Sequence, residues 1–297
     1  MVSGNVSVDI CICTFRRSHV AETLRSISQL LVNPEWSVSV LVVDNDDTPS
    51  ARDIVENAAR DCAFPVRYLY APGRNISVAR NACLDAATAP LVAFIDDDEL
   101  ASPQWLTALV ATLESSKADV VLGPVQAVYA PGCPGWMIQG DFHSTKPVWV
   151  GNEITTGYTS NVLLRRLVGP VKGRRFRREL GQGGEDTMFF SEVHRAGGRI
   201  AYAPEALVTE AVPVERSNLL WLLKRRFRFG ETHALMLMEA PRGGVVTRFK
   251  YIGLAGVKAG FCLFVALLNF ARGDRLRYWV LRGTLHGGVV ARLLAAA

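Results

Sequence analysis

The sequence LVAFIDDDEL, from Leu91 to Leu100, joins an apolar run to three consecutive carboxylates. Its β-branched and aromatic residues favour a strand, and the uninterrupted apolar run predicts that both faces of this strand are buried. Alternate side chains of an extended segment share a face, so Asp96 and Asp98 would converge on one object while Asp97 points away. Hard ions such as Mn²⁺ or Mg²⁺ bind carboxylate, water and phosphate oxygens. The run therefore predicts a site for a divalent ion and a nucleotide diphosphate.

The alternative for these carboxylates is a purely structural one. A helix is expected to begin near Ser102, with Pro103 at its first position, and an acidic loop can cap such a helix. Capping needs only one Asp or Ser, whereas this sequence places three carboxylates beside a core strand. We therefore favour the ion site.

Strand-like and helix-like segments alternate on both sides of this run. The expected strands cover residues 8–13, 38–43, 66–69, 91–95 and 120–122, and the expected helices cover residues 20–31, 51–59, about 76–87 and 102–115. This alternation predicts an α/β domain with a mainly parallel sheet flanked by helices.

Polar residues follow three of the expected strands, at 14–17, 44–47 and 96–98. In open α/β sheets, ligands bind outside the carboxyl ends of the strands, where the strand order reverses. We therefore expect these three segments to form one binding site. The sequence has neither a GxxxxGK[ST] motif nor a dinucleotide-binding fingerprint.

Charge divides the chain into two parts. Residues 1–214 hold 19 Lys and Arg against 24 Asp and Glu, while residues 215–297 hold 14 against 4. We expect a catalytic domain over residues 1–214, with a nucleotide-sugar half at about 1–124 and an acceptor half at about 125–214. The basic tail can meet phosphate or an anionic membrane. Nucleic acid is not an expected partner, because the tail has no nucleic-acid motif.

Residues 252–270 of the tail are apolar apart from Lys258 and Asn269, and are long enough to cross a bilayer. Basic residues flank the segment on both sides, which gives no orientation preference, and a span would leave Lys258 at mid-depth. We therefore expect a helix that docks on the cytoplasmic leaflet, in preference to a span or an ordinary buried helix. Residues 1–9 lack the pattern of a signal peptide, so we expect a cytoplasmic protein that is peripherally associated with the inner membrane.

Another candidate segment is GQGGED, at residues 181–186, which predicts a glycine-rich turn immediately before a helix. Glu185 and Asp186 would stand at the start of that helix. The alternative is that these carboxylates only interact with the helix dipole.

Six motifs carry a family resemblance: CTFRR at 13–17, VVDND at 42–46, NISVARN at 75–81, FIDDDE at 94–99, GGEDTMFF at 183–190 and KRRFRFG at 224–230. Their order and spacing resemble the family 2 glycosyltransferases, which are inverting enzymes. Among these, the chain is most similar to the bacterial exopolysaccharide branch that includes succinoglycan glucosyltransferases. The resemblance covers residues 8 to about 234 and implies a GT-A fold, which is Rossmann-like with a mainly parallel sheet.

The resemblance also implies roles for individual residues. Those implied to bind the nucleotide sugar are Thr14, Arg16, Asp44, Asp46, Arg80, Asn81, Asp96, Asp97, Arg225 and Arg226. Thr14 and Asp44 would hold the base and ribose, and Arg80 would reach toward the nucleotide or its diphosphate. Arg225 and Arg226 would lie near the leaving diphosphate. Asp98 would ligate Mn²⁺ or Mg²⁺ directly, and Asp96 would contact the ribose or metal-bound water. From the residues alone, Arg80 reads equally well as a surface helix charge and Thr14 as an ordinary strand-end hydroxyl.

For the reaction, the resemblance implies that Asp186 is the general base and that Glu185 supports it. A positioned carboxylate can remove the proton from an attacking hydroxyl while a cation neutralises the leaving diphosphate. The expected reaction is therefore an inverting transfer from UDP-glucose to a lipid-diphosphate-linked saccharide in exopolysaccharide synthesis. The alternatives are a nucleotidyltransferase on a similar scaffold, or a catalytically silent membrane scaffold that only binds nucleotide sugars.

The sequence departs from the family pattern at one position. Many GT-A enzymes supply a late histidine to the metal, whereas the corresponding segment of this chain, ALVTEAV, has Thr209 and Glu210. We therefore expect the ion to be held mainly by Asp98 and the donor's diphosphate.

Overall fold

The computed structural model describes residues 6–239 and 245–295. The chain forms two compact units, one from residues 1–128 and 143–211 and the other from residues 129–142 and 212–297. The sequence pattern places residues 129–142 in the first domain. In the structure these residues contain α5 (Gly135–Gly140), whose buried Met137 packs with Leu222 and Leu281 of the C-terminal helices.

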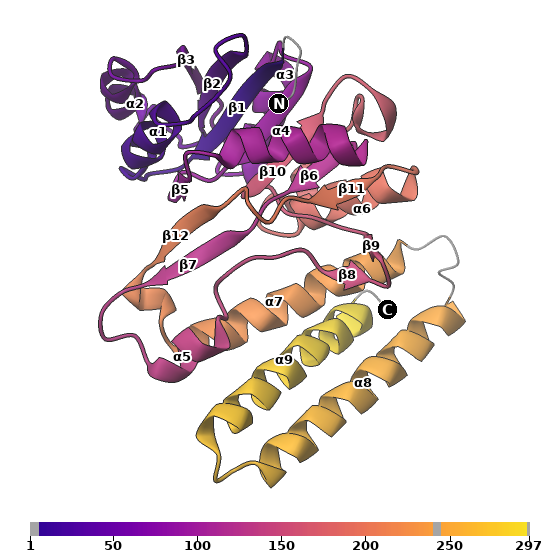
Figure 1. The fold of residues 1–297 in the computed structure, drawn as a ribbon. Helices are drawn as coiled ribbons and strands as arrows, with labels where there is room; N and C mark the ends of the chain where they lie inside the picture. Colours follow the sequence, from indigo (N-terminus) through magenta and orange to yellow (C-terminus); the bar gives the residue numbers. More distant parts are fainter. Residues whose placement is uncertain (1–5, 240–244, 296–297) are drawn as a thin grey trace. The chain divides into compact units, whose positions relative to one another are not determined.

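A seven-stranded sheet forms the centre of the first unit, in the order β11-β6-β10-β4-β1-β2-β3 (Figure 1). Its strands are β1 (Ser7–Thr14), β2 (Ser37–Asp44), β3 (Val66–Tyr70), β4 (Leu91–Ile95), β6 (Val120–Leu122), β10 (Asn161–Arg165) and β11 (Ile200–Tyr202). Only β10 runs antiparallel to its neighbours, and the other strand pairs are parallel. The predicted mainly parallel α/β architecture is therefore confirmed.

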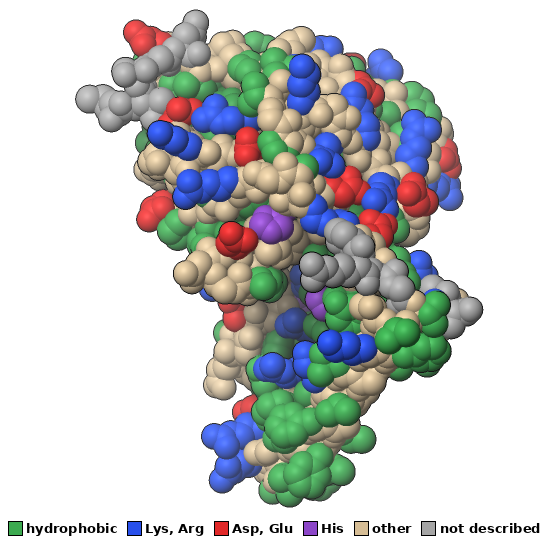
Figure 2. Space-filling view, turned by 90° about the vertical axis from the view of Figure 1, so that its right-hand side faces the viewer, with side chains coloured by type: hydrophobic (Ala, Val, Ile, Leu, Met, Phe, Trp, Pro, Cys, Tyr) green, Lys and Arg blue, Asp and Glu red, His purple; other side chains and the backbone are tan. Residues whose placement is uncertain are grey.

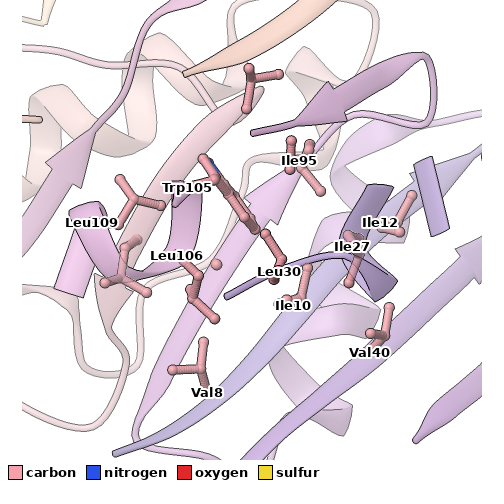
Figure 3. Packing of buried hydrophobic residues seen from close by; sticks show 14 of the residues in the cluster. Val8, Ile10, Ile12, Ile27, Leu30, Val40, Ile95, Trp105, Leu106 and Leu109 are labelled. Carbon is pink, nitrogen blue, oxygen red and sulfur yellow. The ribbon is translucent and has the colours of Figure 1, made fainter. Parts of the chain in front are cut away.

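Helices cover both faces of this sheet. They are α1 (Val20–Ser28), α2 (Arg52–Ala59), α3 (Ile76–Ala86), α4 (Trp105–Ser116) and α6 (Glu185–Arg195), together with the short 3₁₀ turns η1 (Gly169–Val171) and η2 (Arg178–Leu180). On one face, Ile10 and Ile12 of β1 pack with Ile27 of α1 and Trp105 of α4 (Figure 3). Residues between them in β1, such as Cys11, point to the opposite core beneath α3 and α6.

The acidic run forms a turn between two strands. The chain leaves the main sheet after Ile95, and Glu99 begins β5 (Glu99–Ala101) of a three-stranded sheet with β12 (Val208–Val212) and β7 (Val125–Tyr129). A further pair of strands, β8 (Trp149–Val150) and β9 (Glu153–Ile154), lies outside both sheets.

The capping alternative for the acidic run is wrong. Helix α4 begins at Trp105, later than predicted, because the N–H of Ser102 is still bonded to the carbonyl of Leu207. The residue before the helix is Gln104, and none of the described side chains caps α4. The three carboxylates are therefore available for another role.

The second unit contains α7 (Leu219–Met238), α8 (Val245–Leu268) and α9 (Gly273–Ala295), preceded by the turn η3 (Val214–Arg216). Helix α9 packs between α7 and α8 (Figure 1). Helices α7 and α9 cross closely at Gly230, where an added Cβ would lie 2.0 Å from the carbonyl oxygen of Leu285. Ala234, Ala255 and Val289 form the small core that joins the three helices.

Candidate active site

The carboxyl ends of β1, β2 and β4 meet, as the sequence predicts, because these strands are neighbours in the sheet. The Thr14 hydroxyl donates to Oδ2 of Asp97 at 2.7 Å, which joins the end of β1 to the acidic turn. Nε of Arg16 lies 2.9 Å from both carboxylate oxygens of Asp46, which joins the same loop to the end of β2. The three segments therefore form one continuous polar surface.

Arg17 lies in the polar segment 14–17 that the sequence predicts for this site, but its own role was not predicted. Its Nη1 atom lies 2.9 Å from Oδ1 of Asp97 and 2.5 Å from Oδ2 of Asp98. The available signal was its position beside Arg16 in the CTFRR motif. Arg16 has a left-handed backbone conformation, with φ of 56°, and the two arginines bind the ends of different strands.

The three carboxylates are distributed differently from the prediction. Arg17 binds Asp97 and Asp98 together, while the Asp96 carboxylate lies 3.9 Å from Nη2 of Arg80. Asp97 is buried, whereas the Asp96 side chain is 40% exposed. The alternation of an extended strand does not apply to these residues because they form a turn.

Asp44 and Asp46 shape the loop that follows β2. Asp44 is fully buried and accepts hydrogen bonds from the backbone N–H groups of Asp46 and Ala51 and from the Tyr68 hydroxyl, at 3.0, 2.8 and 2.9 Å. The hydrogen bond from Arg16 lowers the pKa of Asp46 to about 2, so this carboxyl is ionised at neutral pH. Both residues hold the loop in place, and their contact with a nucleotide stays a prediction.

Arg80 lies in the interior, so the reading of it as a surface charge is wrong. Asn75 caps α3 by accepting hydrogen bonds from the N–H groups of Ser77 and Val78, and Arg80 follows on the buried side of the helix. The Arg80 guanidinium pairs with Glu185, which stands 105 residues later in the sequence. It also lies 5.7 Å from the ring centroid of Phe176.

The side chain of Asn81, the next residue, forms hydrogen bonds with the protein backbone. Its amide nitrogen donates to the carbonyl of Phe176 at 2.8 Å, and its amide oxygen accepts from the N–H of the same residue at 2.8 Å. Asn81 therefore fixes the loop that leads to α6. A contact between Asn81 and the nucleotide stays a prediction.

Glu185 and Asp186 open helix α6 after a turn that requires glycine. Gly183 and Gly184 have φ values of 140° and 94°, which side chains rarely adopt. Glu185 is buried, and burial raises the pKa of its carboxyl despite the neighbouring Arg80. Within the described part of the chain, its Oε2 atom has no hydrogen-bond partner. Asp186 is half-buried and accepts a hydrogen bond from the N–H of Thr187 at 2.6 Å.

Several acidic side chains lie close to Asp96. Although the Asp96 side chain is 40% exposed, partial desolvation by the surrounding protein, together with the nearby Asp98, raises the pKa of its carboxyl to about 7, and Arg80 acts in the opposite direction. The buried Glu99 accepts a hydrogen bond from the N–H of Asp96 at 2.8 Å, and Glu210 pairs with Glu99 across the β5–β12 ladder. This concentration of carboxylates favours a bound cation.

The donor set fits a divalent ion that takes only part of its coordination from protein. Asp96 and Asp98 offer carboxylate oxygens, which suit Mn²⁺ or Mg²⁺. Across the described residues, no group of three or more His, Cys, Asp and Glu side chains is arranged to hold a metal. Thr209 and Glu210 do lie at the edge of this site, opposite Leu100 and Glu99 in the strand register.

A cavity of about 150 Å³ opens beside Asp98. Its walls come from α1, β5, β7 and β12, and its lining residues are His19, Glu22, Thr23, Asp98, Leu100, Val128, Thr209 and Ala211. The acidic turn is therefore bordered by open space on the side of α1.

Arg225 and Arg226 belong to α7 of the second unit. Arg225 lies 5.3 Å from the ring centroids of Trp221 and Phe229, and Arg226 lies 6.0 Å from that of Phe142. Burial lowers the pKa of Arg226. Their contact with a diphosphate stays a prediction.

Comparisons with known proteins agree with this geometry. The family model described as glycosyl transferase family 2 matches residues 9–168. A succinoglycan biosynthesis protein, ExoM of Rhizobium meliloti (strain 1021), is 48% identical over 295 residues, which cover 99% of this chain and 95% of that protein. A glucosyl-dolichyl phosphate glucuronosyltransferase of Haloferax volcanii is 25% identical, over 80% of this chain and 79% of its own length.

Solved structures show the same fold. A mannosyltransferase from Pyrobaculum calidifontis, in complex with GDP-Man and Mn²⁺, gives a TM-score of 0.65 at 17% identity and covers 99% of this chain and 89% of its own. Residues 1–349 of S. aureus TarS, in complex with UDP-GlcNAc, give 0.56 at 17% identity, over 98% and 91%. The predicted GT-A-like fold is confirmed. The family match over more than half of the chain and the near full-length relative show that this chain belongs to glycosyl transferase family 2.

Proposed function

We propose that this glycosyltransferase moves glucose from UDP-glucose to a lipid-diphosphate-linked saccharide, with inversion, during exopolysaccharide synthesis. The observation that carries the proposal is the single polar surface formed by the ends of β1, β2 and β4, with the Arg80–Glu185 pair beside it. The relative from R. meliloti, named for succinoglycan biosynthesis, supports the pathway. The nucleotide sugars in the solved neighbours support the donor class.

The donor half of the site is proposed to bind a nucleoside diphosphate. Residues assigned to the nucleotide sugar are Thr14, Arg16, Asp44, Asp46, Arg80, Asn81, Asp96, Asp97, Arg225 and Arg226. Asp98 and Asp96 would hold Mn²⁺ or Mg²⁺, and the bound ion would supply positive charge to the leaving diphosphate. Arg80, which is buried and permanently charged, adds positive charge close to Asp96.

The base is proposed to be Asp186. The first turn of α6 holds this carboxylate, and the Arg80–Glu185 pair fixes the orientation of that turn. Asp186 takes the proton of the acceptor hydroxyl while the hydroxyl oxygen bonds to the anomeric carbon and the bond to the diphosphate breaks. Attack from the face opposite the leaving group converts an α-linked donor into a β-glycoside.

The acceptor is proposed to reach the enzyme at the cytoplasmic leaflet of the inner membrane, where the protein is peripherally bound. The apolar helix α8 and the basic charge of residues 215–297 support this location.

The proposal is tested by a UDP-release assay with Mn²⁺, acceptor lipid extract and a panel of UDP-, GDP- and dTDP-sugars. We expect metal-dependent release of UDP from UDP-glucose, and none from the Asp98→Ala variant. Release of pyrophosphate would instead indicate a nucleotidyltransferase. UDP binding by calorimetry without turnover of any donor would indicate the silent scaffold.

A further inference from the structure

Helix α8 exposes a large apolar surface. Among the described residues it is the one helix that is long and apolar enough to cross a membrane, with a mean hydropathy of 2.0 in its most apolar window, yet only 17% of that window is buried. Its exposed large side chains are Val245, Val246, Phe249, Leu254, Val257, Phe261, Leu263, Phe264, Leu267 and Leu268. An exposed apolar patch of this size marks an interaction site.

One side of α8 packs on α9, and the opposite side carries no charge over most of its length. Ala255, Cys262 and Ala266 are the buried residues of the helix, at intervals of seven and four that define the side facing α9. Val257 and Phe264 project from the opposite side, and their exposed fractions are 72% and 59%. We call this side, formed by Val246, Phe249, Gly253, Val257, Gly260, Phe264, Leu267 and Leu268, the outer face. The exposed Lys250 lies on the same side near the start of the helix.

Lys258, the charge in the middle of the helix, does not lie on the outer face. Burial lowers the pKa values of His286 in α9 and His233 in α7, and the next largest contribution to each comes from the nearby charge of Lys258. The helical periodicity also places Lys258 beside the side of α8 that faces α9. Lys258 therefore places no charge on the outer face.

No described part of the chain packs against the glycines of α8. A Cβ atom added at Gly253, Gly256 or Gly260 would meet nothing within 4 Å. The close helix packing that a GxxxG motif favours is therefore not made within the described chain. The outer face is open to a partner from outside it.

Basic and aromatic side chains border this apolar surface. Figure 2 shows Lys and Arg side chains next to the hydrophobic ones over the α8–α9 hairpin. The exposed cations of α8, α9 and the loop between them, among the described residues, are Lys250, Lys258, Arg272, Arg275, Arg282 and Arg292. Phe261 stacks edge-to-face on Trp279, with centroids 5.8 Å apart, and Tyr278 adjoins the same ring. Cations beside Trp and Tyr suit the boundary between anionic headgroups and acyl chains.

The attachment of α8 to α9 excludes a span through the bilayer. Arg248 donates a hydrogen bond to the carbonyl of Leu293 near one end of α8. Along the middle, Gly283 of α9 lies so close to α8 that an added Cβ would be 3.3 Å from Cβ of Cys262, and Phe261 contacts Trp279 further along. If α8 crossed the bilayer, α9 would enter the hydrocarbon with it. Arg275, Arg282 and Arg292 would then leave water, which is strongly unfavourable.

We infer that α8 lies flat in the surface of an anionic bilayer, with its outer face toward the acyl chains and α9 on the aqueous side. This inference deepens the proposed function, because it names the element that would bring the enzyme to a lipid-linked acceptor. Its physical basis is the apolar area of one helix face and the positive charge around it. Neither depends on which sugar is transferred.

Vesicle flotation of the full chain, without nucleotide or acceptor, tests the inference. We expect binding to vesicles of equal parts phosphatidylcholine and phosphatidylglycerol, and weaker binding to phosphatidylcholine alone. Phe264→Asp should weaken binding at least about tenfold, because an aromatic side chain that would insert into the bilayer is replaced by a charge. The control is Val148→Asp in the first unit, where the side chain is 65% exposed, and it should bind as wild type does. Circular dichroism confirms that both variants are folded.

The depth of individual positions separates a flat helix from a span. A fluorophore on Phe249→Cys, Val257→Cys or Phe264→Cys, in a background with Cys62→Ser and Cys133→Ser, should be quenched equally by lipids brominated at a shallow position. Deeper placement of position 257 than of the other two would show a span and overturn the inference. Wild-type binding by Phe264→Asp, or equal affinity for both vesicle types, would also overturn it.

The same purified protein can show two further outcomes. A dimer in solution that Gly256→Leu abolishes would show that a second copy of the chain covers α8, and the bilayer would not be its partner. Vesicle binding together with a failure of UDP release would refute the proposed function and leave the inference on α8 standing.

Discussion

Arg17 forms ion pairs with two carboxylates of the acidic turn, and one of them, Asp97, is buried. Arg17→Gln would leave that charge without its partner. Because the Arg17 side chain is 38% exposed, solvent compensates in part, and we expect a loss of about 1–2 kcal/mol in the free energy of unfolding. Urea unfolding measures it.

The control for Arg17 is Glu56→Gln, which removes an exposed i,i+4 pair with Arg52 and should cost less than about 0.5 kcal/mol. Equal stability of the two variants would show that Arg17 does not support the turn.

Asp186 is proposed to act as the base, so Asp186→Asn should lower kcat by about 10²–10⁴-fold while UDP binding persists. Asp53→Asn is a matched control, because Asp53 holds the same second position of a helix, α2, and loses the same interaction with a helix dipole. Steady-state kinetics and calorimetry check both variants. Wild-type turnover in Asp186→Asn would remove the base assignment.

Asp46 gives a pH dependence whose sign follows from its environment. Arg16 lowers the folded-state pKa of Asp46 to about 2, below its value in an unfolded chain, so the ionised carboxyl contributes stability above the unfolded pKa. That contribution is lost as the pH falls through the folded pKa. We expect Asp46→Asn to be less stable than wild type at pH 7, by an amount that shrinks below pH about 4. A difference that stays constant on acidification would contradict this account.

The turn before α6 is an element whose geometry depends on glycine. Gly183 has φ of 140° and open space around its Cα, so the effect of Gly183→Ala would come from the backbone alone. We expect a loss of about 1–3 kcal/mol in stability, with a fall in kcat because Asp186 shifts with the turn. Gly135→Ala, at a position with equally open space and no positive φ, should lower neither the stability nor kcat. Thermal unfolding and kinetics measure the two variants.

Most elements of the first unit could be predicted because their signals are local. Apolar runs marked the strands, and Asn75 marked the start of α3. The acidic turn could not be predicted, because its shape depends on the pairing of Glu99 with Glu210, more than a hundred residues away. The burial of Arg80 has the same origin, since its partner Glu185 stands on a different helix. Local sequence patterns therefore predicted which residues lie in the site. They could not predict which of these residues pair with one another, because those contacts join residues far apart in the sequence.

Across the first unit, the Arg80–Glu185 pair links α3, on the proposed donor side of the site, to α6, which carries the proposed base Asp186. Arg80→Met would leave Glu185 buried and unpaired, so we expect a loss of about 3–5 kcal/mol in the free energy of unfolding. The double variant Arg80→Met, Glu185→Leu should recover much of that loss, because both charges are then absent.

The control for this cycle is the pair of Arg175 and Asp85, which joins the same helix α3 to the same loop but is at least half exposed at both ends. Removing it should cost less than about 1 kcal/mol. A double variant no more stable than Arg80→Met alone would show that packing, and not charge, holds the two elements together.

The crossing of α7 and α9 at Gly230 has a mechanical consequence. The three C-terminal helices are coupled largely in series, because α8 packs mainly on α9 and α9 packs on α7. A Cβ at position 230 would meet the backbone of α9, which cannot yield as a flexible side chain can. One methyl group there would displace α9 and carry α8 with it. A substitution at residue 230 in α7 would thus change the position of the exposed surface of α8, although residue 230 does not contact that surface.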